Sequence, residues 1–149
     1  MKLEKEIAQE NFKSKKQKAI INLVYTSNWL NQKQTNFFKQ FDLSVQQFNI
    51  LRILRGQHPD PATIKLLKER MLDKMSDASR IVEKLRKKGL VERNECPSDR
   101  RNVDVCITDK GLKLLKKIDE REPELHSLTS NLKKEELEQL NNLLDKLRG

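Results

Sequence analysis

The chain lacks several features that would place it in other classes of protein. Its 149 residues contain no run of about 18 apolar residues that could span a bilayer, and its lysine-rich start lacks the apolar segment of a secretory signal. Two cysteines, Cys96 and Cys106, are too few for a disulfide framework. We therefore expect a cytoplasmic protein without a membrane span, whose thiols are buried or idle.

Residues that commonly carry catalysis or bind metals are also scarce. The sequence has no Gly-rich phosphate loop and no nucleophile elbow, and its two histidines, His58 and His126, do not stand at zinc-site spacing from the cysteines. We predict a protein that is not an enzyme and that holds no metal or cofactor. Its hydrophobic content of 36% allows a modest core, and we expect further apolar surface to be buried against a second subunit.

What the sequence has in excess is positive charge. The net charge is +9, and residues 61–118 carry 16 basic side chains against 9 acidic ones, whereas residues 119–149 carry 5 against 8. Such a balance favours a polyanionic partner, although charge alone is weak evidence. The excess is largest in the central part of the chain.

Apolar spacing predicts a mainly helical chain with one small β-hairpin. The first forty residues, without Pro or Gly, read as one or two long helices. The hairpin strands are expected at residues 90–93 and 103–108, where strict pairing places Cys96 opposite about residue 103. The other expected helices are one capped near Ser44 with a stop at Gly56, one from Thr63 to about Lys74, one capped by Ser76, one capped by Thr108 and interrupted at Pro123, and one from about Lys133.

The last helix carries leucines at spacings of three, four and three: Leu137, Leu140, Leu144 and Leu147. So regular a seam in a terminal helix needs a partner. It could pack on its own domain, or it could form a dimer interface with the N-terminal helix; we favour the dimer.

The segment of residues 75–89 predicts a basic amphipathic helix. Ala78, Ile81, Val82 and Leu85 share one face, which leaves polar and charged side chains opposite, free to touch a groove. Near the helix start Ser79 and Arg80 can reach base edges, while Lys84, Lys87 and Lys88 suit phosphates. Glu83 could accept a hydrogen bond from cytosine, but an ion pair with Arg80 or Lys87 is the favoured interpretation. The competing view is a solvated surface helix.

A basic hairpin tip follows in residues 97–102, and with the helix it makes up the parts of a winged helix-turn-helix. Asp99 can accept from Arg101 or from its own turn, which would brace the tip and present Arg100 to a minor groove or a sugar-phosphate edge. A solvated loop arginine is the alternative. The predicted DNA-contacting residues are Ser76, Asp77, Ser79, Arg80, Lys84, Lys87, Arg100, Arg101 and Asn102.

These residues resemble the multiple antibiotic resistance regulator (MarR) family of bacterial transcription factors. The resemblance rests on Asp99-x-Arg101 followed by Val105-x-Ile107-Thr108-x-x-Gly111, and on Ser79-Arg80 followed by Leu85, Gly89, Leu90, Val91 and Arg93. It implies one domain over residues 1–149, with a winged helix at about 44–118 between dimerisation helices at about 1–41 and 119–149. It also implies a homodimer whose recognition helices enter successive major grooves of a pseudo-palindromic operator, about 34–36 Å apart.

The chain departs from the family pattern in two places. The segment of residues 70–75 contains no glycine, where the family commonly has one in its turn, so the resemblance implies the two helices but not the angle at which they cross. The family's redox sensors use a cysteine near the N-terminus, which this chain lacks. Peroxide sensing by that route is therefore not expected.

The resemblance also implies an effector, since many members bind small aromatic or phenolic molecules that separate the recognition helices. Candidate pocket residues are Tyr25, Trp29, Phe37, Phe38, Phe48 and His58. Aromatic residues at helical spacing are more often core, and that interpretation is favoured. We predict a sequence-specific DNA-binding regulator, acting as a homodimeric repressor; activation depends on operator position and stays open. The alternative is a dimeric helical adaptor that grips a protein, although a protein-binding wing would more often expose apolar residues than Arg100, Arg101 and Asn102.

Overall fold

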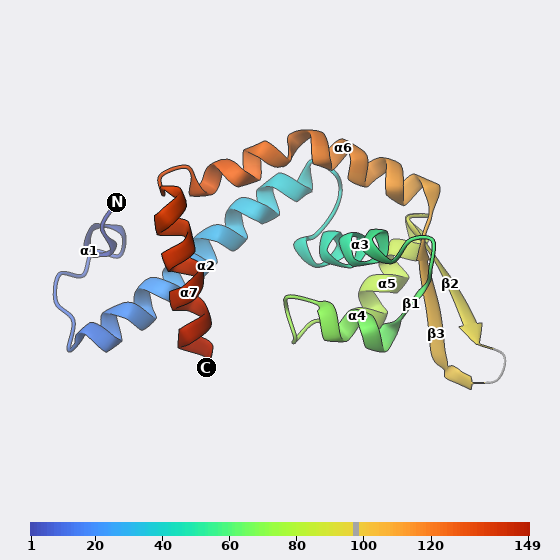
Figure 1. The fold of residues 1–149 in the computed structure, drawn as a ribbon, viewed down its shortest axis with the longest axis horizontal. Coiled ribbons are helices and arrows are strands. Elements are labelled where there is room, and N and C mark those ends of the chain that lie inside the picture. Colours follow the sequence, from blue (N-terminus) through green and yellow to red (C-terminus); the bar gives the residue numbers. More distant parts are fainter. Residues whose placement is uncertain (97–98) are drawn as a thin grey trace. The chain divides into compact units, whose positions relative to one another are not determined.

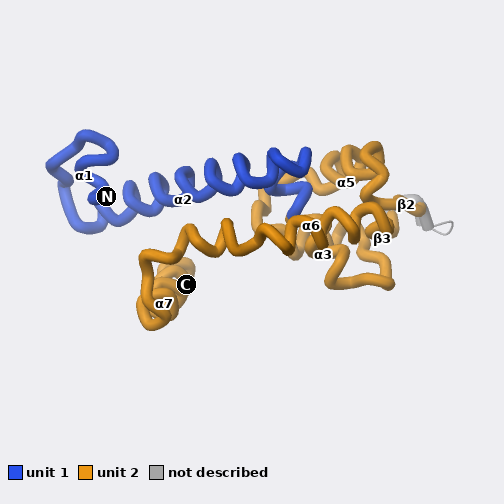
Figure 2. Tube along the Cα trace, turned by 90° about the horizontal axis from the view of Figure 1, so that it is seen from above, with its two compact units in different colours: residues 1–48 blue, residues 49–149 orange. Residues whose placement is uncertain are grey.

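The computed structural model describes residues 1–96 and 99–149, and the side chains of residues 95–102 lie outside its described part. The chain divides into two compact units, residues 1–48 and 49–149, each described here by itself (Figure 2). Helices predominate, and one small antiparallel sheet accompanies them (Figure 1). The predicted class, mainly α with a small β-hairpin, is confirmed.

The first unit is built around one long helix. α2, Lys15–Lys39, follows the short α1, Leu3–Glu6, and the Ser14 hydroxyl caps α2 by accepting from the Gln17 N–H at 3.1 Å. Because no Pro or Gly interrupts it, α2 continues for 25 residues. This confirms the prediction of one or two long helices in the first forty residues.

Helix α3, Val45–Gln57, runs across the boundary between the units. Ser44 precedes it and its hydroxyl accepts from the Gln47 N–H at 3.0 Å, as the cap predicted there requires. The helix ends one residue after Gly56, the predicted stop.

The second unit combines helices with the sheet. After the C-terminal part of α3 it contains β1 (Ala62–Thr63), α4 (Ile64–Arg70), α5 (Ala78–Lys87), β2 (Val91–Cys96), β3 (Asp99–Ile107), α6 (Asp109–His126), the 3₁₀ turn η1 (Ser127–Thr129) and α7 (Lys134–Arg148). Its buried core comes from every helix up to α6 and from the sheet. The fully buried large side chains of this unit are Ile50, Leu51, Ile53, Leu54, Leu67, Met71, Val82, Leu85, Val105, Leu115 and Ile118.

The sheet has the order β1-β3-β2 with antiparallel neighbours. On β3 the predicted alternation is present, because Val103, Val105 and Ile107 are buried. Strand β1 was not predicted from the sequence: Ala62 lies opposite Val105, and a strand of two residues is too short to show a period. The hairpin therefore has a third strand along the free edge of β3.

Two predicted helix boundaries are wrong. α4 ends at Arg70 rather than near Lys74, because Met71 already adopts an extended conformation, with φ −64° and ψ 140°, where the chain turns toward α5. α5 is capped by Asp77 rather than Ser76: the Asp77 carboxylate accepts from the Arg80 N–H at 3.2 Å. Aspartate and serine cap helices about equally well, so composition could not choose between the neighbours.

The hairpin register keeps the cysteines apart. Glu92 lies opposite Cys106 and Glu95 opposite Val103, and a register shift follows between Glu95 and Cys96. Cys96 therefore pairs with Asp99 and not with residue 103, four positions from the predicted partner, because the register shift follows Glu95. Cys106 is a free, half-buried cysteine.

The C-terminal helices differ from the prediction at Pro123. The predicted cap Thr108 starts α6, but the helix continues through Pro123 to His126. Proline removes one N–H donor, and that loss does not end a helix whose neighbouring residues favour the helical conformation. α7 begins at the predicted place but buries none of its side chains, and Leu140 and Leu147 are exposed. The other two leucines of the seam, Leu137 and Leu144, are half-buried, so the seam is only partly covered within the second unit.

Candidate nucleic-acid interface

Helix α5 separates a buried face from a charged one. Ala78, Val82 and Leu85 are completely buried and Ile81 is half-buried, as the helical wheel predicts. The opposite face leaves the side chains of Ser79, Arg80, Lys84 and Lys87 exposed. The exposed residues among the predicted DNA contacts therefore stand together on one side of a firmly anchored helix.

The start of α5 is arranged differently from expectation. Asp77 is exposed and occupied as the cap, whereas the Ser76 hydroxyl is buried without a hydrogen-bond partner in the described part of the chain. Ser79 and Arg80 follow in the first turn, where free main-chain N–H groups and the positive end of the helix dipole favour phosphate. The Asp77 carboxylate reduces that positive field, so side-chain cations are the main attraction for a polyanion.

The turn between α4 and α5 is fixed by two side chains, Asn49 and Asp73, that were not among the predicted site residues. Asn49 of α3 is buried, and its Oδ1 accepts from the Leu72 N–H at 2.9 Å. Asp73 accepts from the Met75 N–H through its carboxylate at 3.0 Å and from the Ser76 N–H through its carbonyl at 3.2 Å. The position of Asn49 among the apolar residues of α3 could have indicated this role, because a buried amide needs a hydrogen-bond partner.

Glu83 does not form the predicted pair with Arg80 or Lys87. It accepts two hydrogen bonds from Arg86, at 2.7 and 2.9 Å, and its carboxylate lies 3.8 Å from the Arg93 guanidinium on β2. Arg86 is the main reason why the pKa of Glu83 falls below its ordinary value. Because Glu83 pairs with Arg86, the charges of Arg80 and Lys87 stay available to a binding partner.

The end of α5 is tied to the start of α6. Gly89 adopts φ +74°, a left-handed conformation that ends the helix and suits glycine. The Thr108 hydroxyl donates to the Gly89 carbonyl at 2.7 Å and accepts from the Gly111 N–H at 3.1 Å. A Cβ on Gly111 would lie 2.5 Å from the Leu90 carbonyl oxygen, so the close approach at this junction requires glycine.

The wing is formed by β2 and β3, with β1 on its outer side. The predicted contacts Arg100, Arg101 and Asn102, and the predicted brace between Asp99 and Arg101, concern side chains outside the described part of the chain. The backbone of these residues belongs to β3. Their contacts to DNA stay predictions.

Five of the six predicted pocket residues belong to the first unit, where they fall into two groups. Phe38 stacks on Phe48 with ring centroids 4.2 Å apart, and Phe37 meets Phe38 edge to face at 5.1 Å. These three belong to one aromatic cluster of the first unit. His58 is exposed and belongs to the second unit.

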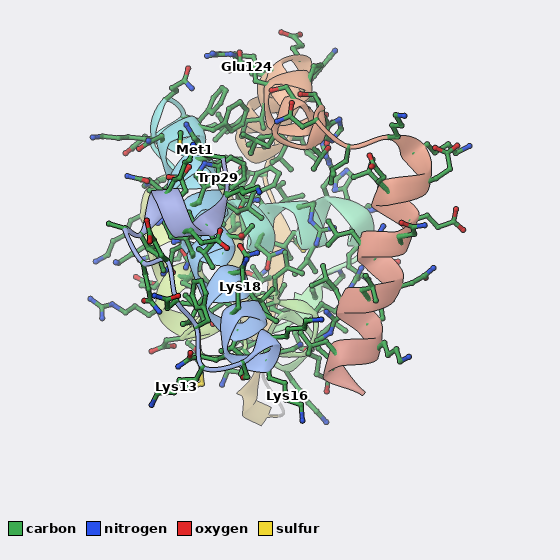
Figure 3. All side chains as sticks on the ribbon, turned by 90° about the vertical axis from the view of Figure 1, so that its left-hand side faces the viewer. Met1, Lys13, Lys16, Lys18, Trp29 and Glu124 are labelled. Atoms are coloured by element: carbon green, nitrogen blue, oxygen red, sulfur yellow. The ribbon has the colours of Figure 1, made fainter. Side chains whose placement is uncertain are left out.

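Tyr25 and Trp29 line a separate surface cavity of ≈ 290 Å³ within the first unit. Figure 3 shows Met1 and Trp29 near each other, where α1 lies beside α2. The Tyr25 hydroxyl donates to the Glu6 carboxylate at 2.8 Å, which raises the pKa of the tyrosine. An ion pair between Lys18 and Glu4 also links the two helices. The remaining lining residues are Leu3, Asn22 and Thr26.

The Cys106 side chain is partly shielded from solvent. Burial raises the pKa of the Cys106 thiol, and the carboxylates of Asp104 and Glu92 act in the same direction. A thiol held protonated is a poor nucleophile. Within residues 1–96 and 99–149 no group of three or more His, Cys, Asp or Glu side chains could hold a metal ion. Nor does a helix in this part of the chain have the length and apolarity to cross a membrane.

Comparisons of the sequence and of the structure with known proteins match the same family, MarR. The model of the MarR family matches residues 43–103. A MarR transcription factor from Planctomyces limnophilus is 34% identical, with 91% of this chain and 98% of that chain aligned at a TM-score of 0.70. A mutant MarR from E. coli in complex with operator DNA is 26% identical, with 99% of both chains aligned at a TM-score of 0.73.

Among curated relatives, the HTH-type transcriptional regulator SarZ of Staphylococcus haemolyticus is 27% identical over 92 residues, which are 62% of this chain. The chain spans 61% of the length of that relative.

Proposed function

The chain belongs to the MarR family of transcription regulators, and we propose that it binds duplex DNA sequence-specifically as a homodimeric repressor. Members of this family are transcription factors, which confirms the expectation that the chain is not an enzyme. The observation that carries the proposal is the exposed face of α5, where Ser79, Arg80, Lys84 and Lys87 stand on a helix with a completely buried opposite side.

The roles of these side chains follow from their chemistry. Arg80, in the first turn of α5, can donate two hydrogen bonds to guanine, and Ser79 beside it can adapt to either donor or acceptor. Lys84 and Lys87 lie farther along the helix and carry point charges suited to phosphate. Arg100 and Arg101 would hold the wing against the backbone of the same duplex. Base selection should therefore depend mainly on α5, and anchoring on the lysines and the wing.

A homodimer is supported by apolar side chains that the terminal helices leave uncovered. On α2 these include Ile20 and Val24, 64% and 55% exposed, and on α7 they include Leu147, 64% exposed. Exposed leucines at regular helical spacing are typical of a helix that packs against a second copy. We expect Leu147→Glu to yield monomers in sedimentation equilibrium, and Lys146→Glu, a charge change at the next position, to leave the dimer intact. Equal effects of both changes would argue against the interface.

The proposal includes a small aromatic effector. The cavity lined by Tyr25 and Trp29 has a volume of ≈ 290 Å³, and a phenolic ring could stack on the indole there. Release from DNA would require that the ligand prefer a dimer whose recognition helices are misaligned. Displacement of labelled operator by simple phenols, lost in Trp29→Ala, tests this part.

The competing function is a helical adaptor that binds another protein. Selection of bound sequences from random duplexes separates the two, because an adaptor enriches no sequence. A palindromic site supports the dimeric regulator, whereas salt-sensitive binding without a preferred sequence supports a nonspecific architectural role. The position of such a site relative to a promoter then distinguishes repression from activation.

Two substitutions divide base reading from anchoring. Arg80→Ala should relax the preference at one base pair of the selected site, a loss of about 1–3 kcal/mol of discrimination. Lys87→Ala should instead weaken binding about equally on all sequences. If Arg80→Ala also weakens every sequence uniformly, Arg80 belongs to the phosphate contacts.

The wing contact is tested by the salt dependence of binding. Arg100→Ala should reduce the slope of log K against log salt by about one phosphate contact. Lys16→Ala removes the same charge from α2 and serves as the matched control, with an unchanged slope. A slope that Arg100→Ala does not alter contradicts a role for this residue on DNA.

A further inference from the structure

The turn that leads into α5 exposes two apolar side chains. Leu72 is 81% exposed and Met75 is 93% exposed, although Met71, directly before them, is buried in the core. Single exposed apolar residues are common on protein surfaces and need no function. Leu72 and Met75 differ from such scattered residues because they lie directly before α5 on a turn whose backbone is fixed by hydrogen bonds.

Hydrogen bonds fix the backbone that carries both side chains. The Leu72 N–H donates to the buried Asn49 side chain at 2.9 Å, and the Met75 N–H donates to the Asp73 carboxylate at 3.0 Å. A further bond at 3.2 Å joins the Ser76 N–H to the Asp73 carbonyl. Met75 is thus held outward by an ordered turn, and a partner that contacts it does not have to order a loop first.

Charged and polar groups flank Met75 along the chain. Exposed Asp73 and Lys74 precede it and Asp77 caps α5 two residues later; exposed Ser79 and Arg80 then follow in the first turn of the helix, with Lys84 and Lys87 beyond. The cations of α5 make this face complementary to a polyanion, and Met75 stands at its start. An apolar side chain within it calls for an apolar group on the polyanion itself, and in the major groove that group is the 5-methyl of thymine.

We propose that Met75 reads thymine by packing its side chain against the 5-methyl group of one base in each operator half-site. The inference rests on the proposed DNA-binding function and adds a specificity-determining residue outside the helix. A methionine suits the task, because its flexible, polarisable thioether adapts to the shape of an apolar group. The contacted thymine should lie next to the bases that Ser79 and Arg80 read, because Met75 comes just before them in the chain.

The test removes each partner of the contact in turn: the 5-methyl group of thymine and the side chain of Met75. In the selected operator each thymine is replaced in turn by deoxyuridine, which keeps base pairing and lacks only the methyl group. With the unaltered full-length protein, one position per half-site should weaken binding about three- to fivefold, the effect of burying one methyl group. With Met75→Ala, methyl removal at that position should have no further effect.

Leu72→Ala is the matched control. Leu72 belongs to the same turn and is nearly as exposed, but it lies beside the end of α4, so its truncation should leave the methyl effect unchanged. Circular dichroism of both variants checks that the fold is retained.

The outcomes separate this inference from the function on which it rests. Sequence-selective binding in which no thymine responds to methyl removal, or in which the response persists in Met75→Ala, overturns the role of Met75 and leaves the regulator intact. A selected half-site without a required thymine does the same. Absence of sequence-selective binding by the unaltered protein rejects the proposed function, and the role of Met75 with it.

Discussion

Thr108 joins the end of α5, the sheet and α6, and its substitution tests how this junction is held together. Its hydroxyl donates to the Gly89 carbonyl at 2.7 Å and accepts from the Gly111 N–H at 3.1 Å. Its own N–H donates to the Leu90 carbonyl at 3.1 Å. The first two bonds depend on the side chain, whereas the third belongs to the backbone and survives any substitution except proline.

Thr108→Val removes the hydroxyl and keeps the shape of the side chain. Loss of a helix cap costs about 1 kcal/mol, and loss of a neutral hydrogen bond costs a further 0.5–1.5 kcal/mol or so. Thr108 is half-buried, and water can replace part of both bonds. We therefore expect the free energy of unfolding to fall by about 1–2 kcal/mol, which lowers the urea midpoint by about 0.5–1 M.

Thr108→Ser is the matched control, because serine retains the hydroxyl and both of its bonds while losing a methyl group. Urea unfolding followed by circular dichroism compares the variants at one protein concentration, since a dimer's stability depends on concentration. Equal midpoints for Thr108→Val and Thr108→Ser would show that the hydroxyl contributes nothing, and would refute this account of the junction.

Three further predictions concern the same unit. Gly111→Ala places a Cβ 2.5 Å from the Leu90 carbonyl oxygen, so we expect a loss of about 1–3 kcal/mol in urea unfolding; an unchanged midpoint would mean that α6 shifts freely. Asn49→Ala leaves the Leu72 N–H without its acceptor and should cost about 1–3 kcal/mol. An unchanged urea midpoint for Asn49→Ala would contradict the assigned bond. The raised pKa of Cys106 lowers its thiolate fraction at neutral pH. In the Cys96→Ser variant, Cys106 should therefore be alkylated more slowly than a model thiol, and its rate should rise only at a higher pH. Identical pH profiles for Cys106 and the model thiol would contradict the raised pKa.

Much of the second unit could be predicted from local pattern. The buried stripe of α5 and the alternation of β3 follow from periods of 3.6 and two, which depend on neighbouring residues only. Thr63 and Thr108 cap α4 and α6 as expected, because a threonine hydroxyl directly before a helix can accept a hydrogen bond from a main-chain N–H of the first turn.

Some errors were choices between local alternatives, and others depended on residues distant in sequence. Asp77 rather than Ser76 caps α5, although both could do so. Glu83 pairs with Arg86 and lies near Arg93, a residue that only the folding of β2 brings to it. Strand β1 exists because β3 offers it an edge.

The amino-acid sequence by itself determined the order and type of most elements and the basic, amphipathic character of α5, since these depend on spacing and composition. Only the tertiary structure decided how α5 is fixed: by Asn49 at the turn before it and by Thr108 at the junction after it. A hydrogen bond between residues far apart in the chain depends on where the backbone places the donor and acceptor, and no local period encodes that placement. For the same reason, the proposed contact of Met75 with thymine follows from the exposed position in which the turn holds this residue, and not from the sequence pattern around it.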